Sequence, residues 1–316
     1  RTAPPERQRE LRIEACEICL HRMRDRRRAL ELIEALAADF PEDAATQDFY
    51  EEILRGGGDR AALATHLLDR ARRSADDAQE RLRLCLEALA LRRDALDDAA
   101  GALEAVDLMC AIAPDFLPAL KGRAELLAAL GQDEELALHL ERWAGHAGER
   151  LKPRLCVRLA HLYEFRLGLF EEALRVHEEI LGMLPDRVES HWARARLAHR
   201  LGRHHVRVVA LCDLADHVED GGERVAILER AARLAEQIDA DALDIWTRII
   251  EFDPDHGGAR RGLERCRLAA GEHGRLLNGY LAQAKAAEGI HRAHFLMRIA
   301  SVYEQMGRIS DACEIL

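Results

Sequence analysis

Apolar residues recur along most of the chain at intervals of three and four positions, which is the spacing of one face of an α-helix. One such stripe consists of Ala29, Leu32, Ile33 and Leu36, and a similar stripe crosses residues 59–73. Leu, Ala, Arg and Glu dominate the composition, and straight side chains such as these lose little freedom in a helix. The pattern predicts an all-α protein.

The stripes and the residues that interrupt them predict a series of helices with short breaks. Asp25 is a candidate N-cap and Pro41 ends a helix, since proline cannot continue one. Residues 1–5 are expected to be a frayed lead-in, and polar breaks are expected at 74–79, 145–153 and 219–222. The predicted helices are 6–22, 26–39, 43–55, 59–73, 79–94, 98–112, 116–129, 133–146, 154–166, 170–183, 187–200, 204–218, 223–237, 240–252, 257–269 and 273–287, and a last pair begins near Ile290.

Prolines and glycines in these breaks recur at a fixed distance. A glycine follows a proline by seventeen positions four times, and an alanine follows each glycine by thirteen. The successive prolines are 73, 71 and 69 residues apart, and so are the glycines. Half of that period is about 35 residues, close to the length of a helix–turn–helix repeat. The residues are Pro41, Pro114, Pro185 and Pro254; Gly58, Gly131, Gly202 and Gly271; Ala71, Ala144, Ala215 and Ala284.

Each long period therefore holds two unlike helical hairpins, one that ends in proline and one that turns on glycine. The whole of residues 1–316 is expected to form a single solenoid of about eight hairpins and a truncated ninth. The double repeats are expected at about 6–73, 79–146, 154–218, 223–287 and 290–316.

Several of these hairpins carry a known repeat pattern. Residues 159–185 place Leu159-Ala160, Tyr163, Gly168, Ala173 and Pro185 at its small, aromatic and proline positions. Residues 298–316 repeat the first part, and residues 29–41 and 102–114 match the second helix with its proline.

In these positions the chain resembles the tetratricopeptide repeat (TPR) family. The resemblance implies a right-handed α-solenoid in which the first helix of each hairpin, helix A, lines the concave face. Small residues at the helix crossing would let the two backbones approach, and stacking would bury the stripe that no hairpin can bury alone. The hairpins that turn on glycine lack the closing proline of the family.

Charge and cysteine content limit the classes of partner. The formal net charge is −11, which argues against general nucleic-acid or membrane-surface binding. The eight cysteines mostly lie singly in separate helices, so we interpret them as buried thiols in a reducing compartment, which favours a cytoplasmic location. The sequence contains no run of about 18 apolar residues, so no membrane span is predicted. Since the sequence starts at Arg1 and ends within a predicted helix, it is expected to be a piece of a longer protein.

The candidate binding residues are those on helix A that the packing stripe leaves over. We expect them to form a basic groove with one exposed aromatic residue, suited to an acidic or carboxylate-bearing peptide, because arginine offers a fork of donors. The alternative is a solvated helix face neutralised by Glu189 and Glu264. The candidate residues are Lys121, Trp192, Arg196, His199, Arg200, Arg261 and Arg265.

Other groups of residues favour structural roles. The histidines between 191 and 217 are interpreted as surface side chains, and Cys16 and Cys19 as core residues rather than metal ligands. The three glycines at 56–58 lack the strand and the Gly-Lys-Ser/Thr ending of a phosphate-binding loop. With no catalytic motif and no metal or cofactor site expected, the protein is not predicted to be an enzyme.

Two functions follow from these expectations. The first is a non-catalytic scaffold that binds a protein or peptide, or another part of its own chain, in the concave groove. The alternative is a regulatory or substrate-recruiting arm of a larger enzyme or signalling protein whose catalytic domain lies outside these residues. A purely architectural or self-associating spacer is the third and weakest possibility.

Overall fold

The computed structural model describes residues 5–73 and 77–316. Within these residues it contains eighteen α-helices, three short π-helical turns and no strand. The predicted all-α class is therefore confirmed. Residues 1–4 of the expected lead-in and residues 74–76 of the expected polar break lie outside the described residues.

The chain divides into two compact units, Arg1–His146 and Ala147–Leu316, and the division falls within the predicted break at 145–153. The first unit contains α1 (Pro5–Glu17), η1 (Ile18–Arg22), α2 (Arg26–Asp39), α3 (Ala44–Gly57), α4 (Arg60–Arg73), α5 (Ala78–Ala90), η2 (Leu91–Ala95), α6 (Ala99–Ile112), α7 (Leu117–Leu130) and α8 (Asp133–His146). The second contains α9 (Lys152–Leu162), η3 (Tyr163–Leu167), α10 (Phe170–Met183), α11 (Val188–Arg200), α12 (His204–His217), α13 (Gly221–Gln237), α14 (Leu243–Phe252), α15 (Gly257–Ala269), α16 (His273–Ala286), α17 (Gly289–Gln305) and α18 (Ile309–Ile315).

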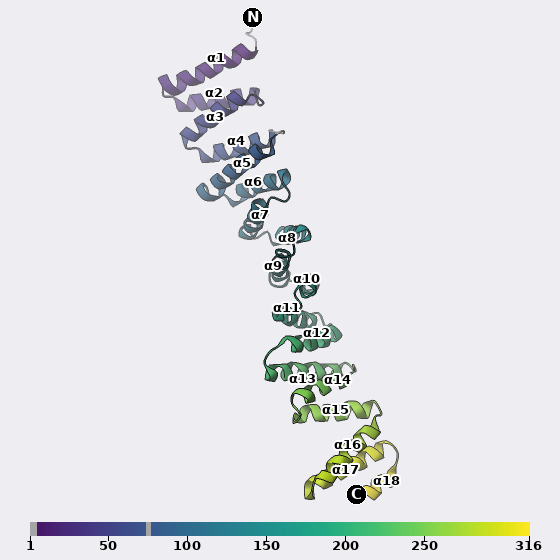
Figure 1. Cartoon of the computed structure of the whole chain (residues 1–316). Coiled ribbons are helices and arrows are strands. Elements are labelled where there is room, and N and C mark those ends of the chain that lie inside the picture. Colours follow the sequence, from purple (N-terminus) through teal and green to yellow (C-terminus); the bar gives the residue numbers. More distant parts are fainter. Residues whose placement is uncertain (1–4, 74–76) are drawn as a thin grey trace. The chain divides into compact units, whose positions relative to one another are not determined.

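Consecutive helices in each unit run back and forth and are joined by short turns (Figure 1). Within each unit, a helix packs chiefly against the helices of that unit that precede and follow it in the chain. This is the arrangement of stacked helical hairpins, in which neighbouring elements supply most of the packing.

Local sequence explains where these helices begin. The side chains of Asp25, Asp43 and Asp98 each accept a hydrogen bond from a backbone N–H in the first turn, at 3.1, 3.0 and 2.9 Å. Such caps satisfy N–H groups that the helix itself leaves free. The predicted N-cap at Asp25 is therefore confirmed.

Two series of residues with positive φ mark the tips of the hairpins. One series consists of Gly58, Gly131, Gly202 and Gly271. The other consists of Arg24, Asp97, Gly168, Asp239 and Gly307, whose spacings of 73, 71, 71 and 68 residues are close to those of the first series. The second series therefore recurs at nearly the same interval as the first.

Three predicted helices end differently from the expectation. The helices expected at 6–22, 79–94 and 154–166 change to π-helical turns over their last residues, at η1, η2 and η3. In each turn a backbone N–H reaches the carbonyl five residues back, as Leu96 does to Leu91 at 3.1 Å. Each of these three π-helical turns follows the first helix of a predicted double repeat.

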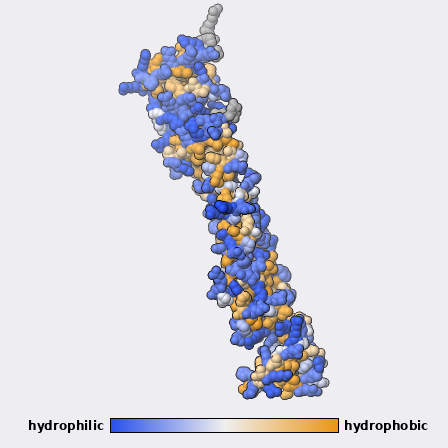
Figure 2. All heavy atoms as spheres, in the orientation of Figure 1, coloured by the Kyte–Doolittle hydropathy of each residue, from blue (hydrophilic) through white to orange (hydrophobic). Residues whose placement is uncertain are grey.

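The cores consist of leucine, alanine and other apolar side chains from neighbouring helices. One cluster in the first unit joins residues of α3 to α7, and one in the second unit joins residues of α11 to α15. On the face that Figure 2 displays, hydrophobic residues lie between hydrophilic ones along both units. Cys16, Cys19, Cys85 and Cys156 are buried as free thiols, whereas Cys313 is exposed, contrary to the expectation of buried thiols.

None of the helices in residues 5–73 and 77–316 combines the length and the apolar character that a membrane crossing requires.

Candidate binding groove

The predicted binding residues fall on three helices of two units. Lys121 lies on α7 in the first unit, where it is exposed and makes no ion pair with the described residues. The other six residues belong to the second unit, on α11 and α15. The candidate site is therefore described for the second unit by itself.

Arg196 on α11 is engaged within the protein. Its Nε and Nη2 donate to the two carboxylate oxygens of Glu164, at 2.8 and 2.7 Å. The Glu164 side chain is only 1% exposed. A buried carboxylate needs such donors, because its removal from water is costly when it is unpaired. The positive charge of Arg196 is thus used to balance Glu164.

Arg265 on α15 has a similar partner. Its Nη2 donates to both oxygens of Glu236, at 3.0 and 2.9 Å. Glu236 also accepts a hydrogen bond of 2.9 Å from Nε1 of Trp246, whose side chain is almost fully buried. The expected neutralising residues, Glu189 and Glu264, are not the partners of these two arginines.

The remaining α11 residues differ from the expected basic face. Trp192 is half-buried and packs on the cluster of α11 to α15, so it is not the exposed aromatic residue that we expected. The Nδ1 of His199 lies 2.9 Å from Nη1 of Arg207 on α12. Arg200 is exposed, with its guanidinium 5.0 Å from the ring centre of Phe170. Of these residues, Arg200 presents the least engaged cation.

Arg261 lies in a pocket of about 380 Å³ that residues of α14 to α17 line. Five arginines face this pocket together with Glu264, Tyr280 and His294. The arginines are Arg260, Arg261, Arg267, Arg275 and Arg298. We call this pocket the α15–α17 groove.

Three of the five arginines in the α15–α17 groove are balanced by carboxylates. Arg298 pairs with Glu264 at 2.6 Å, and its guanidinium lies over the ring of Tyr280. Arg260 and Arg275 pair with the aspartate and the glutamate that lie near them in the sequence, at 2.7 and 3.1 Å. These pairs account for the positive charge of three side chains.

Arg261 and Arg267 make no ion pair with the described residues. The Nε of Arg267 is buried and has no hydrogen-bond partner among them. Burial, followed by the carboxylate of Glu264, raises the pKa of Tyr280 to about 12, so its phenol keeps its proton at neutral pH. The groove therefore combines two unbalanced guanidinium groups with neutral polar side chains, which suits a ligand that carries carboxylates.

The described histidines, cysteines and acidic residues do not form a comparable site for metal binding or thiol chemistry. Among residues 5–73 and 77–316, no three His, Cys, Asp or Glu side chains are arranged to hold a metal ion. The rings of His191 and His217 stack with centroids 4.5 Å apart, and His191 is buried rather than at the surface as expected. Burial raises the pKa of the Cys16 and Cys85 thiols to about 11, which keeps both in the unreactive protonated form.

The sequence pattern indicates Arg261 but not Arg267 or Arg298, which line the same groove. Arg267 lies on the same helix as Arg261, and Arg298 lies on α17, where the predicted repeat places the next helix A. The recurrence of arginines on successive A helices is the sequence signal that could have indicated Arg298.

Comparison with known proteins gives matches to solved structures alone. No protein-family model matches the sequence, and no protein with a curated description does. The structure of YrrB, "a TPR protein with an unusual peptide-binding site", is 14% identical and covers 64% of this chain and 99% of its own, with a TM-score of 0.34. A tetratricopeptide repeat protein from Parabacteroides merdae is 14% identical and covers 82% of this chain and 98% of its own, with a TM-score of 0.27. The MamA protein is 13% identical and covers 59% of this chain and 88% of its own, with a TM-score of 0.32.

The class of protein follows from its own helices, which in each unit stack as antiparallel, TPR-like hairpins of an α-solenoid.

Proposed function

We propose that the protein is a non-catalytic scaffold that binds an acidic peptide, or an acidic segment of a protein, in the α15–α17 groove. The observation that carries this proposal is the pair of arginines, Arg261 and Arg267, that no carboxylate of the described residues balances. A peptide with Asp or Glu side chains supplies the missing negative charge, and arginine can hold each carboxylate through two parallel hydrogen bonds.

This proposal changes which residues of the predicted site contact the partner. Arg261 keeps its predicted role, and Arg267 joins it. Arg196 and Arg265 are assigned to internal ion pairs with Glu164 and Glu236. Arg200 remains available on α11, as a secondary contact.

The cytoplasmic location and the lack of nucleic-acid binding stay predictions. The eight free cysteines support the first and the net charge of −11 supports the second.

The experiment measures the binding of fluorescein-labelled hexaglutamate by fluorescence anisotropy at low salt. We expect Arg261→Glu and Arg267→Glu each to weaken binding by about tenfold or more, equivalent to about 1.4 kcal/mol. Raising the salt concentration should weaken binding to the wild-type protein, because solvent-exposed charges are screened.

Arg292→Glu provides the matched control. Arg292 is an exposed arginine on α17 that does not line the groove, and its reversal changes the net charge by the same amount. If Arg292→Glu weakened binding as much as the groove variants, the attraction would come from overall charge and the proposed site would be wrong.

A further inference from the structure

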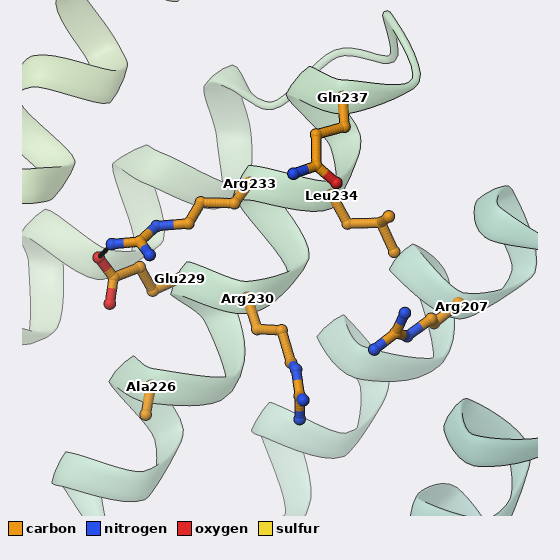
Figure 3. A pocket seen from close by; sticks show the side chains of 7 residues that line it. All are labelled: Arg207, Ala226, Glu229, Arg230, Arg233, Leu234 and Gln237. Atoms are coloured by element: carbon orange, nitrogen blue, oxygen red, sulfur yellow. Dashed lines mark hydrogen bonds and ion pairs between the residues drawn. The ribbon is translucent and has the colours of Figure 1, made fainter. Parts of the chain in front are cut away.

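A second basic pocket lies between α12 and α13 and has a volume of about 470 Å³. Figure 3 shows the seven residues that line it: Arg207, Ala226, Glu229, Arg230, Arg233, Leu234 and Gln237. It shares no lining residue with the α15–α17 groove. We call it the α12–α13 pocket.

Two arginines project into the space between the two helices. Arg207 reaches in from α12 and Arg230 from α13, whereas Arg233 turns away from them toward Glu229 (Figure 3). Arg233 and Glu229 form an ion pair of 2.5 Å. The Glu229 carboxylate is therefore already paired with Arg233, and no other lining residue carries a negative charge to balance Arg207 and Arg230.

The surroundings of Arg207 further disfavour its positive charge. Arg207 is half-buried, and its Nη1 contacts the Nδ1 of His199, a group that supplies no negative charge. Burial, followed by the charge of Arg230, lowers the pKa of Arg207. Both causes disfavour its positive charge, so a bound anion would relieve the repulsion between the two arginines.

We propose that the α12–α13 pocket binds a phosphate dianion, either free or as a monoester, between Arg207 and Arg230. The charge of such a group matches the two unbalanced guanidinium groups, whereas a carboxylate would balance only one. Arginine presents its N–H donors in a fork that fits the oxygens of a phosphate group. Leu234 and Ala226 add apolar surface, and the Gln237 amide adds a further donor at the edge.

This inference is independent of the proposed peptide groove, since it concerns other helices and a different ligand. Free phosphate and a phosphorylated side chain share the dianion, so the experiment includes both. Isothermal titration calorimetry at about pH 8.5 keeps both ligands dianionic, because this pH lies above the second pKa of phosphoserine, about 6, and above the higher second pKa of inorganic phosphate. The ligands are inorganic phosphate, a phosphoserine peptide, the same peptide without phosphate, and acetate.

We expect inorganic phosphate and the phosphoserine peptide to bind, and acetate and the unphosphorylated peptide to bind at least about tenfold more weakly. Tighter binding of the phosphoserine peptide than of inorganic phosphate would assign the site to a phosphorylated partner, and the reverse order would assign it to a small phosphate. Arg207→Gln and Arg230→Gln should each reduce phosphate affinity by about tenfold or more. Arg230 is exposed and makes no ion pair with the described residues, so its variant should fold normally.

Arg203→Gln is the matched control, because Arg203 precedes α12, lies outside the pocket and pairs with Glu171 at 2.6 Å. Affinity that is unchanged in Arg207→Gln and Arg230→Gln, or that falls equally in Arg203→Gln, would overturn the proposal. So would acetate binding as tightly as phosphate.

Discussion

The ion pair between Arg196 and Glu164 offers a sharp test of how the second unit is held together. Arg196→Met keeps most of the side-chain volume but removes both donors to the Glu164 carboxylate. The carboxylate then stays buried without a partner, because its side chain is only 1% exposed. Breaking a buried ion pair in this way costs about 3–5 kcal/mol when both partners are buried.

The expected magnitude here is smaller than that range. The Arg196 side chain is 46% exposed, so water already screens its half of the pair and can enter when it is removed. We therefore expect a loss of about 2–3 kcal/mol in the free energy of unfolding. For a unit of this size, that loss lowers the melting temperature by roughly 4–12 °C.

The assay is urea unfolding followed by helical circular dichroism at neutral pH. Glu164→Gln in the Arg196→Met background should recover about 1 kcal/mol or more, because the buried charge is gone. Arg203→Met is the matched control: Arg203 and Glu171 are 48% and 51% exposed, so their pair should contribute about 0–1 kcal/mol. Equal losses in the two arginine variants, or no recovery in the double variant, would refute the assigned role of Arg196.

Three further predictions concern single positions. Gly122→Ala should raise the free energy of unfolding by up to ~1 kcal/mol through helix propensity, since its new Cβ would lie 3.6 Å from the nearest side chain. Gly262→Ala should lower the free energy of unfolding by about 1–3 kcal/mol, because its new Cβ would overlap the Trp246 ring. Urea unfolding of both variants tests this contrast. Asp97→Gly should stabilise the first unit by up to ~1 kcal/mol, measured in the same way, because Asp97 has a φ of 52° that glycine adopts more readily. Burial lowers the pKa of His177 from 6.5 to about 4, so between these pH values the unfolded chain binds a proton that the folded chain does not. The free energy of unfolding should therefore fall by up to ~3 kcal/mol as the pH drops from 6.5 to about 4. Urea titrations at several pH values should show a flatter pH dependence for His177→Leu.

Much of the secondary structure could be predicted from prolines, glycines and apolar stripes. The helices expected at 133–146, 170–183 and 257–269 have the same bounds in α8, α10 and α15. These segments are bounded by clear helix-breaking residues, so local sequence is sufficient to place their ends.

The turns at Arg24, Asp97 and Asp239 could not be predicted from glycine alone. These residues adopt the positive φ that glycine adopts at the equivalent turns, with φ values of 54°, 52° and 53°. Side chains resist this conformation, so a search for glycine misses them. Their spacing of 73 and then 142 residues is the signal that a search by period would have found.

The charge balance of the site also depended on contacts that are distant in sequence. Arg196 and Arg265 were left over from the packing stripe, as predicted, but their carboxylate partners lie 32 and 29 residues earlier. Those separations are close to one hairpin, so the partners come from the preceding hairpin of the stack. Glu189 and Glu264, the neutralising residues expected from the sequence, lie on the same helices as the arginines, whereas Glu164 and Glu236 lie on η3 and α13.

Photo-cross-linking tests most directly whether an acidic peptide binds in the α15–α17 groove. Hexaglutamate that carries a benzophenone at one end would be irradiated with the wild-type protein, and the linked residues identified by mass spectrometry. We expect cross-links within α15, α16 and α17, and we expect them to be lost in the Arg261→Glu and Arg267→Glu variants but not in Arg292→Glu. Cross-links confined to other helices, or a pattern that the groove variants leave unchanged, would contradict binding in this groove.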